Sequence, residues 1–105
     1  MINSFLIFES QNPDIYRYFV RFTFEVIKTG RTNYSVNAIF ERIRWHTEIE
    51  TRGSDFKLNN NYRAYYARMF MHEYPTFSGF FNTRTMKDEQ RLTEWLQSIF
   101  TEEAA

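Results

Sequence analysis

The sequence contains no cysteine, three glycines, two prolines and two histidines. Without cysteine the chain has no disulfide, no thiol nucleophile and no thiolate ligand for zinc. So few glycines leave no glycine-rich phosphate-binding loop. His46 and His72 show neither of the spacings, HxxxH and HExxH, that direct two imidazoles at one metal ion. We therefore expect no metal and no other cofactor.

Long apolar runs are also absent. The clearest apolar cluster near the N-terminus is Phe5 to Phe8, and no positive charge precedes it. It matches neither a signal peptide nor a transmembrane segment. Together with the lack of cysteine, this pattern predicts a cytoplasmic protein with no membrane partner.

An excess of charge of one sign is missing too, because the formal net charge is zero. Neutrality argues against an indiscriminate polyanion binder. The charges are nevertheless uneven: Asp14 to Arg68 carries ten basic against six acidic residues, whereas from Arg84 onward three basic residues face five acidic ones. This distribution predicts either a nucleic-acid face with an acidic opposite side or simply solvated charges on helices.

Aromatic residues are abundant, with 12 Phe, 7 Tyr and 2 Trp among 105 residues. A chain of this length forms one domain, so we expect a single unit over residues 1–105. Its core should be built from rings rather than from Leu and Val. Trp45, beside Arg44, is expected to be half exposed.

Helix signals divide most of the chain. The first expected helix, 13–29, has Asn12 as N-cap, Pro13 in its first turn and Gly30 as C-terminal cap. The second, 35–51, begins after the cap Ser35 and ends before Gly53. The fourth, 86–101, is amphipathic and starts at a sequence that resembles a capping box.

The third expected helix, 60–73, is the segment around which the rest of the chain is arranged. Asn60 or Asn61 is its predicted N-cap, and Pro75 stops it. One apolar stripe follows the helical period: Tyr62, Tyr65, Tyr66, Met69 and Phe70. Core packing is predicted for Tyr62, Tyr66, Met69 and Phe70, and the alternative is that the tyrosines are exposed and stack on the bases of a single strand. Arg63, Arg68 and the asparagines lie off the stripe and form a polar, cationic edge.

Residues 77–84 predict a small β ribbon, because Ser78 and Gly79 make a turn between two phenylalanines. Three helices followed by a ribbon is the order of elements in a winged helix-turn-helix. We therefore predict a mainly α, winged helix-turn-helix-like domain. A plain helical bundle with a hairpin predicts nearly the same pattern.

Four segments, NPDIYRYF, YSVNAIFERIRW, KLNNNYRAYYARMF and GFFNTR, resemble a pattern of small phage and prophage proteins. The resemblance spans about Asn12 to Arg84 and carries no established chemistry. It implies a viral or mobile-element origin, a host-cell cytoplasm and no catalytic residue. Two functions stay open, which are DNA binding or regulation, and inhibition of a host protein such as a defence nuclease.

The letters of one nuclease pattern, PD and DxK, occur at Pro13-Asp14 and at Asp55 to Lys57. In such nucleases two carboxylates on adjacent strands hold a divalent metal. Here Asp14 opens a helix and too little strand is predicted to build that sheet. We therefore expect no enzyme.

The leading prediction is a non-enzymatic protein that binds duplex DNA, and the alternative is a protein-binding inhibitor that uses the same surface. Phosphate contacts are predicted for the basic residues of the middle segment, and base contacts for the polar edge of helix 60–73. Arg84, at the base of the ribbon, is expected to reach phosphate or the minor groove. The full predicted set is Arg42, Arg44, Lys57, Asn60, Asn61, Arg63, Arg68 and Arg84. A homodimer through the surplus aromatic surface is also open.

Overall fold

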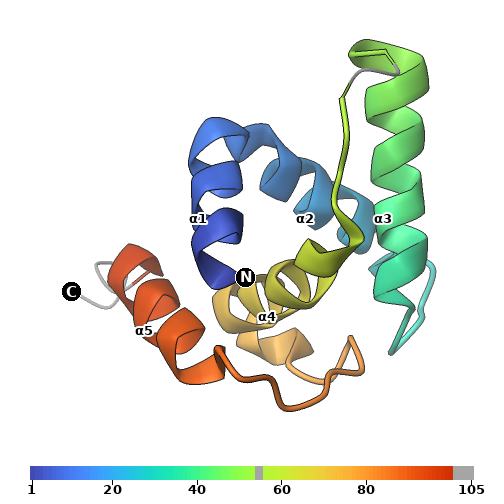
Figure 1. Cartoon of the computed structure of the whole chain (residues 1–105). Helices are drawn as coiled ribbons and strands as arrows, with labels where there is room; N and C mark the ends of the chain where they lie inside the picture. The colour runs from blue at the N-terminus through green and yellow to red at the C-terminus, as the bar shows by residue number, and fades with distance from the viewer. Residues whose placement is uncertain (54–55, 101–105) are drawn as a thin grey trace.

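The computed structural model describes residues 1–53 and 56–100, and every regular element in these ranges is helical (Figure 1). The elements are α1 (Ile2–Gln11), α2 (Pro13–Ile27), α3 (Val36–Arg44), the π-helix η1 (Trp45–Thr51), the 3₁₀ turn η2 (Asn60–Tyr62), α4 (Arg63–Glu73), the 3₁₀ turn η3 (Pro75–Phe77) and α5 (Glu89–Phe100). The expected helices 13–29, 35–51, 60–73 and 86–101 correspond to α2, α3 with η1, η2 with α4, and α5.

The predicted winged helix-turn-helix with a β ribbon is wrong. Residues 77–84 contain no strand: η3 ends at Phe77, and Phe80 N–H donates to Phe77 O at 2.9 Å to close a turn. The physical reason lies in Phe80 and Phe81, which are both buried, whereas successive side chains of a strand point to opposite faces. Tyr34 N–H donates to Phe80 O at 3.1 Å, but this is a single bond and not a ladder.

Helix α1 is absent from the sequence prediction. Its segment carries no acidic residue in the first turn, no basic residue in the last and no side-chain cap, so the usual boundary signals are missing. Tertiary burial holds it: Ile2 and Phe5, three residues apart, are 3% and 0% exposed. In the described ranges no helix combines the length and the apolar composition that a membrane span requires.

Helix α4 lies at the centre of the fold and packs against α2, α3 and α5 (Figure 1). The predicted aromatic stripe is core, because Tyr62, Tyr65, Tyr66, Met69 and Phe70 are all buried. The ring of Phe5 stacks on Tyr65 with centroids 4.8 Å apart and meets Tyr66 edge to face at 5.1 Å. A helix enclosed in this way offers little free face, so it does not have the exposure of a recognition helix.

Asn12 lies at the junction between α1 and α2. Pro13 opens α2 as expected, but the Asn12 side chain makes no capping bond to α2. Instead its Nδ2 donates to Phe8 O at 3.0 Å, a carbonyl at the end of α1 that also accepts from the Asn12 backbone N–H, and its Oδ1 accepts from Arg52. Asn12 therefore stabilises the end of α1 rather than the start of α2.

Helix α3 and η1 form one rod that stands along the edge of the molecule, and the chain then returns beside it to α4 (Figure 1). Ser35 caps the rod as predicted, since its Oγ accepts from Ala38 N–H at 3.3 Å. Gly53, with a positive φ of 86°, permits the reversal that follows η1. At one end of the rod the first residues of α3 lie beside the start of α4, and further along the rod Trp45 is exposed.

Candidate functional site

Six of the eight residues predicted to bind nucleic acid lie in three places in the structure. Arg44 and Asn60 join α3 to the chain that enters α4. Arg42 lies on the other side of α3, against α2. Arg63, Arg68 and Arg84 line one groove.

Arg44 is an internal clamp. Its Nη1 pairs with Glu41 at 2.6 Å, and its Nη2 donates to Leu58 O at 2.9 Å and to Asn60 Oδ1. Only 18% of the Arg44 side chain is exposed. Its donors are thus largely used in fixing residues 56–62, the connector that leads into α4, to α3. The Asn60 side chain accepts from Arg44 and is therefore not the predicted N-cap of the helix. Asn59 is the N-cap instead, since its Oδ1 accepts from Asn61 N–H at 2.8 Å.

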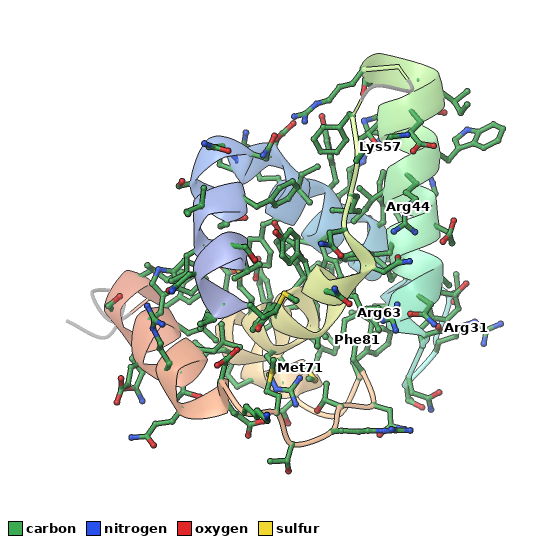
Figure 2. All side chains as sticks on the ribbon, viewed as in Figure 1. Arg31, Arg44, Lys57, Arg63, Met71 and Phe81 are labelled. Carbon is green, nitrogen blue, oxygen red and sulfur yellow. The ribbon has the colours of Figure 1, made fainter. Side chains whose placement is uncertain are left out.

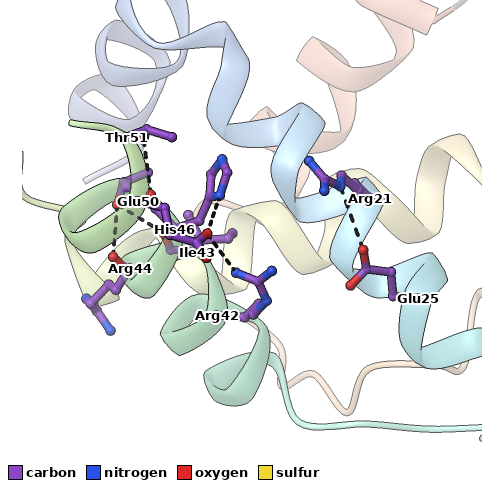
Figure 3. Close-up of polar contacts among 9 residues, drawn as sticks. Arg21, Glu25, Arg42, Ile43, Arg44, His46, Glu50 and Thr51 are labelled. Atoms are coloured by element: carbon purple, nitrogen blue, oxygen red, sulfur yellow. Dashed lines mark hydrogen bonds and ion pairs between the residues drawn. The ribbon is translucent and has the colours of Figure 1, made fainter.

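Arg42 belongs to a cluster of polar and aromatic side chains between α2 and η1 (Figure 3). Its guanidinium lies over the Phe22 ring, 4.1 Å from the centroid, and 3.7 Å from Glu50. Glu50 also meets His46 Nδ1 at 2.8 Å, and this hydrogen bond lowers the pKa of the Glu50 carboxyl. The charge of Arg42 is therefore offset by a neighbouring carboxylate.

A groove of about 540 Å³ lies between the start of α3, the start of α4 and the segment 82–86. We call it the arginine groove. Its lining includes three arginines and several uncharged polar groups, and contains no acidic residue: Val36, Asn37, Arg63, Ala64, Ala67, Arg68, Asn82, Thr83, Arg84, Thr85 and Met86. Asn37, Asn82 and the threonines were not predicted, and no motif marks them, because they come from segments far apart in the sequence.

Arg68 supports the wall of this groove from beneath. Its Nη2 donates to Arg84 O, its Nε to Glu89 at 3.2 Å, and its Nη1 to Ala64 O at 3.3 Å. With 12% of its side chain exposed, it holds the segment around Arg84 against α4. Its role in the structure is positional.

Arg63 and Arg84 differ from the other arginines of the set. Arg63 is partly buried and Arg84 is exposed. Within residues 1–53 and 56–100 neither has a carboxylate within ion-pair distance, whereas Arg42, Arg44 and Arg68 do. Both guanidinium groups are therefore uncompensated cations on the wall of one groove.

Two helices contribute the residues of their first turn to the same groove. Val36 and Asn37 begin α3, and Arg63 and Ala64 begin α4. Backbone N–H groups of a first helical turn have no partner within the helix and carry partial positive charge. This holds for α3, whereas α4 continues from η2 and its Arg63 N–H already donates to Asn60 O. The groove thus combines two guanidinium groups that have no carboxylate partner in the described ranges with one positive helix end, which is an arrangement suited to an anion.

Lys57 and Asn61 are both exposed on the connector beside α3. Figure 2 shows Arg63, Arg44 and Lys57 following this connector upward from the groove. Neither residue lines the arginine groove.

The other titratable residues weighed from the sequence do not converge. Asp14 is paired with Arg52, and Asp55 lies outside the described residues. His72 packs against the Phe100 ring with centroids 5.8 Å apart. Among the residues with described positions, no three His, Asp or Glu side chains gather as a metal site would require.

A partly buried cluster of two carboxylates and two tyrosines was missed by sequence reasoning. Tyr66 Oη donates to Glu9 at 3.0 Å, Tyr16 Oη donates to Glu73 at 2.6 Å, and the two tyrosine rings stack with centroids 6.2 Å apart. Burial raises the pKa of Glu9 to about 7 and raises that of both tyrosines. The partners are 57 residues apart, so no local pattern reveals them. The cluster ties α1 and α2 to α4.

Comparison with family models, with curated proteins and with solved structures finds no match to this chain.

Proposed function

We propose that the protein binds a nucleic acid through the phosphate backbone, in a phage or prophage setting, with the arginine groove as the site. The observation that carries this proposal is the pair Arg63 and Arg84, two cations without carboxylate partners in the described ranges, on a groove lined by no acid. Phosphate is the nucleic-acid group that such a site recognises, and arginine binds it with two parallel hydrogen bonds.

Electrostatics explain how a neutral protein can bind a polyanion here. Coulombic attraction depends on the local field, and the carboxylates that pair with Arg42 and Arg44 do not line the groove. Glu89, which pairs with Arg68, borders the groove and lines the adjoining pocket. Asn37, Asn82 and Thr85 add neutral hydrogen-bonding groups that suit sugar and phosphate oxygens.

Binding of a fluorescent oligonucleotide, followed by anisotropy at several salt concentrations, tests the proposal. We expect the affinity of the parent protein to fall steeply with salt. Arg63→Ala and Arg84→Ala each remove one guanidinium that binds phosphate, so each should flatten the log–log slope by about 0.7–0.9. Arg91→Ala is the matched control, because Arg91 is exposed on α5 and does not line the groove.

Two results would contradict the proposal. One is the absence of binding by the parent protein at low salt. The other is an equal loss of affinity in Arg91→Ala and in the groove variants, which would show that only total charge matters. Circular dichroism of each variant verifies that it folds.

A protein partner is the second candidate function, and Trp45 with Ile49 favours it. These side chains are 57% and 65% exposed and lie four residues apart on η1, so together they form a small apolar surface on the projecting rod. An inhibitor of a host defence nuclease would bury both. Inhibition of a purified nuclease that is lost in Ile49→Ser but kept in Arg63→Ala would support this function over nucleic-acid binding.

A further inference from the structure

Trp45 carries an aromatic side chain that is exposed on the surface. In the described ranges the exposed large apolar side chains are Met1, Ile7, Trp45 and Ile49, and Trp45 alone among them is a ring. The local structure holds it outward: Thr47 is 0% exposed and bonds back to Ile43 O at 3.0 Å, while His46 packs edge to face on Tyr18. The segment around Trp45 is therefore held in place by its neighbours while the indole itself faces solvent.

The position of Trp45 relates it to the arginine groove. Asn37 lines the groove, and Trp45 follows it by eight residues on one continuous rod, which places Trp45 about 12 Å along the rod and about 80° around it. Between them Arg44 bonds to Leu58 O and Asn60, on the chain that leads into Arg63. The rod therefore leads from the groove, past the connector, to the indole, which lies about a quarter turn around the rod from the groove side.

The distance is short on the scale of a nucleic-acid strand. Eight residues of helix rise about 12 Å, which equals about four nucleotides at the axial rise of about 3.4 Å per nucleotide of a stacked strand, and fewer nucleotides in an extended strand. Lys57, exposed on the connector, adds a cation along this path (Figure 2).

We infer that the nucleic acid bound at the arginine groove is single-stranded, and that Trp45 stacks on one of its bases. This inference rests on the proposed function. Sites for single strands combine a cationic groove for the backbone with exposed rings on which bases stack. A duplex keeps its base faces covered, so it gives the indole nothing to stack on. Helix α4, with its aromatic stripe in the core, also lacks the free face that major-groove reading needs.

Anisotropy with 12-nucleotide thymidine and uridine oligomers, compared with a hairpin duplex, tests the inference. We expect single strands to bind more tightly than the duplex, and Trp45→Ala to weaken single-strand binding about tenfold with little effect on the duplex, as loss of one stacked base predicts. Trp45→Phe should recover part of the loss. Ile49→Ser is the matched control, exposed on the same segment without a ring.

Fluorescence supplies a direct readout. Trp95 packs edge to face on Phe5, so a Trp95→Phe protein keeps a ring there and leaves Trp45 as the only indole. We expect its emission to be quenched by the single-stranded oligomers and not by the hairpin.

The outcomes separate the two proposals. Equal affinity for duplex and single strand, with no effect of Trp45→Ala, would overturn the inference and leave the groove function standing. Equal losses in Trp45→Ala and Ile49→Ser would also overturn it, because they indicate apolar docking. If the parent protein binds none of the oligonucleotides, the groove function fails and the inference with it.

Discussion

Replacement of Glu9 by Gln removes the carboxyl that links α1 to α4. Glu9 is partly buried and accepts a hydrogen bond from Tyr66 Oη at 3.0 Å. Burial raises its pKa from 4.5 to about 7, against the smaller lowering effects of the Tyr66 hydrogen bond and of Arg17. Glutamine keeps the size of the side chain and an oxygen that accepts from Tyr66. The variant therefore isolates the charge.

The magnitude follows from linkage between proton binding and folding. A pKa rise of this size in a fully buried group corresponds to about 3 kcal/mol of unfolding free energy that is lost when the group ionises. Glu9 is only partly buried, so solvent screening reduces the effect, and we expect about 1–2 kcal/mol. In a domain of this size, that difference shifts the melting temperature by about 5–10 °C.

The direction of the pH dependence of stability follows from the raised pKa of Glu9 in the folded state. The stability that the protein gains by keeping Glu9 neutral is fully present below the unfolded pKa of 4.5 and is lost as the pH rises through about 7. Parent and Glu9→Gln should therefore have nearly equal stability at pH 4.5, while at pH 8 the variant should be the more stable. Urea unfolding followed by circular dichroism at both pH values measures this.

Glu94→Gln is the control, because it makes the same charge change at an exposed position on α5. The stability difference between Glu94→Gln and the parent should not grow between pH 4.5 and pH 8. A difference between Glu9→Gln and the parent that is the same at both pH values would refute the reasoning, since Glu9 would then ionise alike in the folded and unfolded chains.

Four further substitutions test the packing. Asn12→Ala should lower the unfolding free energy by about 1 kcal/mol in a urea titration, and adding Arg52→Ala should cost less than the sum of the single effects, because their side chains bond to each other. Arg68→Ala should cost about 1.5–3 kcal/mol, since the Arg84 carbonyl loses a charged donor; an unchanged melting temperature would contradict this. Phe5→Ala should cost about 3–5 kcal/mol and make α1 sensitive to protease, whereas a protease-resistant α1 would show that its docking does not depend on that ring.

Local signals in the sequence were reliable where a cap and an apolar period agreed. Pro13 at the start of α2, Ser35 before α3 and the stripe of α4 were all identified, because caps and helical periodicity act within a few residues of the chain. Segments without such signals were misread. Helix α1 forms through burial of Ile2 and of Phe5, whose ring packs on Tyr65 and Tyr66 of α4, and consecutive Phe80 and Phe81 both entered the core instead of alternating.

The candidate site was predictable only in its residue types. An excess of basic residues in the middle of the chain was evident, and the pairing of Arg44 with Glu41, three residues apart on one helix, follows from their spacing. The partner of Arg68, Glu89, is 21 residues away and meets it only in the folded chain. Composition and spacing therefore do not separate Arg68 from Arg63 and Arg84.

The sequence by itself determined the helices with caps, the ring-built core and the exclusion of cysteine chemistry, because these depend on residue type and near neighbours. The tertiary structure alone decided that α4 is enclosed, that segment 82–86 closes a groove against two helix starts, and that two arginines remain on it without carboxylate partners in the described ranges. Burial and long-range electrostatics join residues distant in the chain, so they become visible only when the chain is folded.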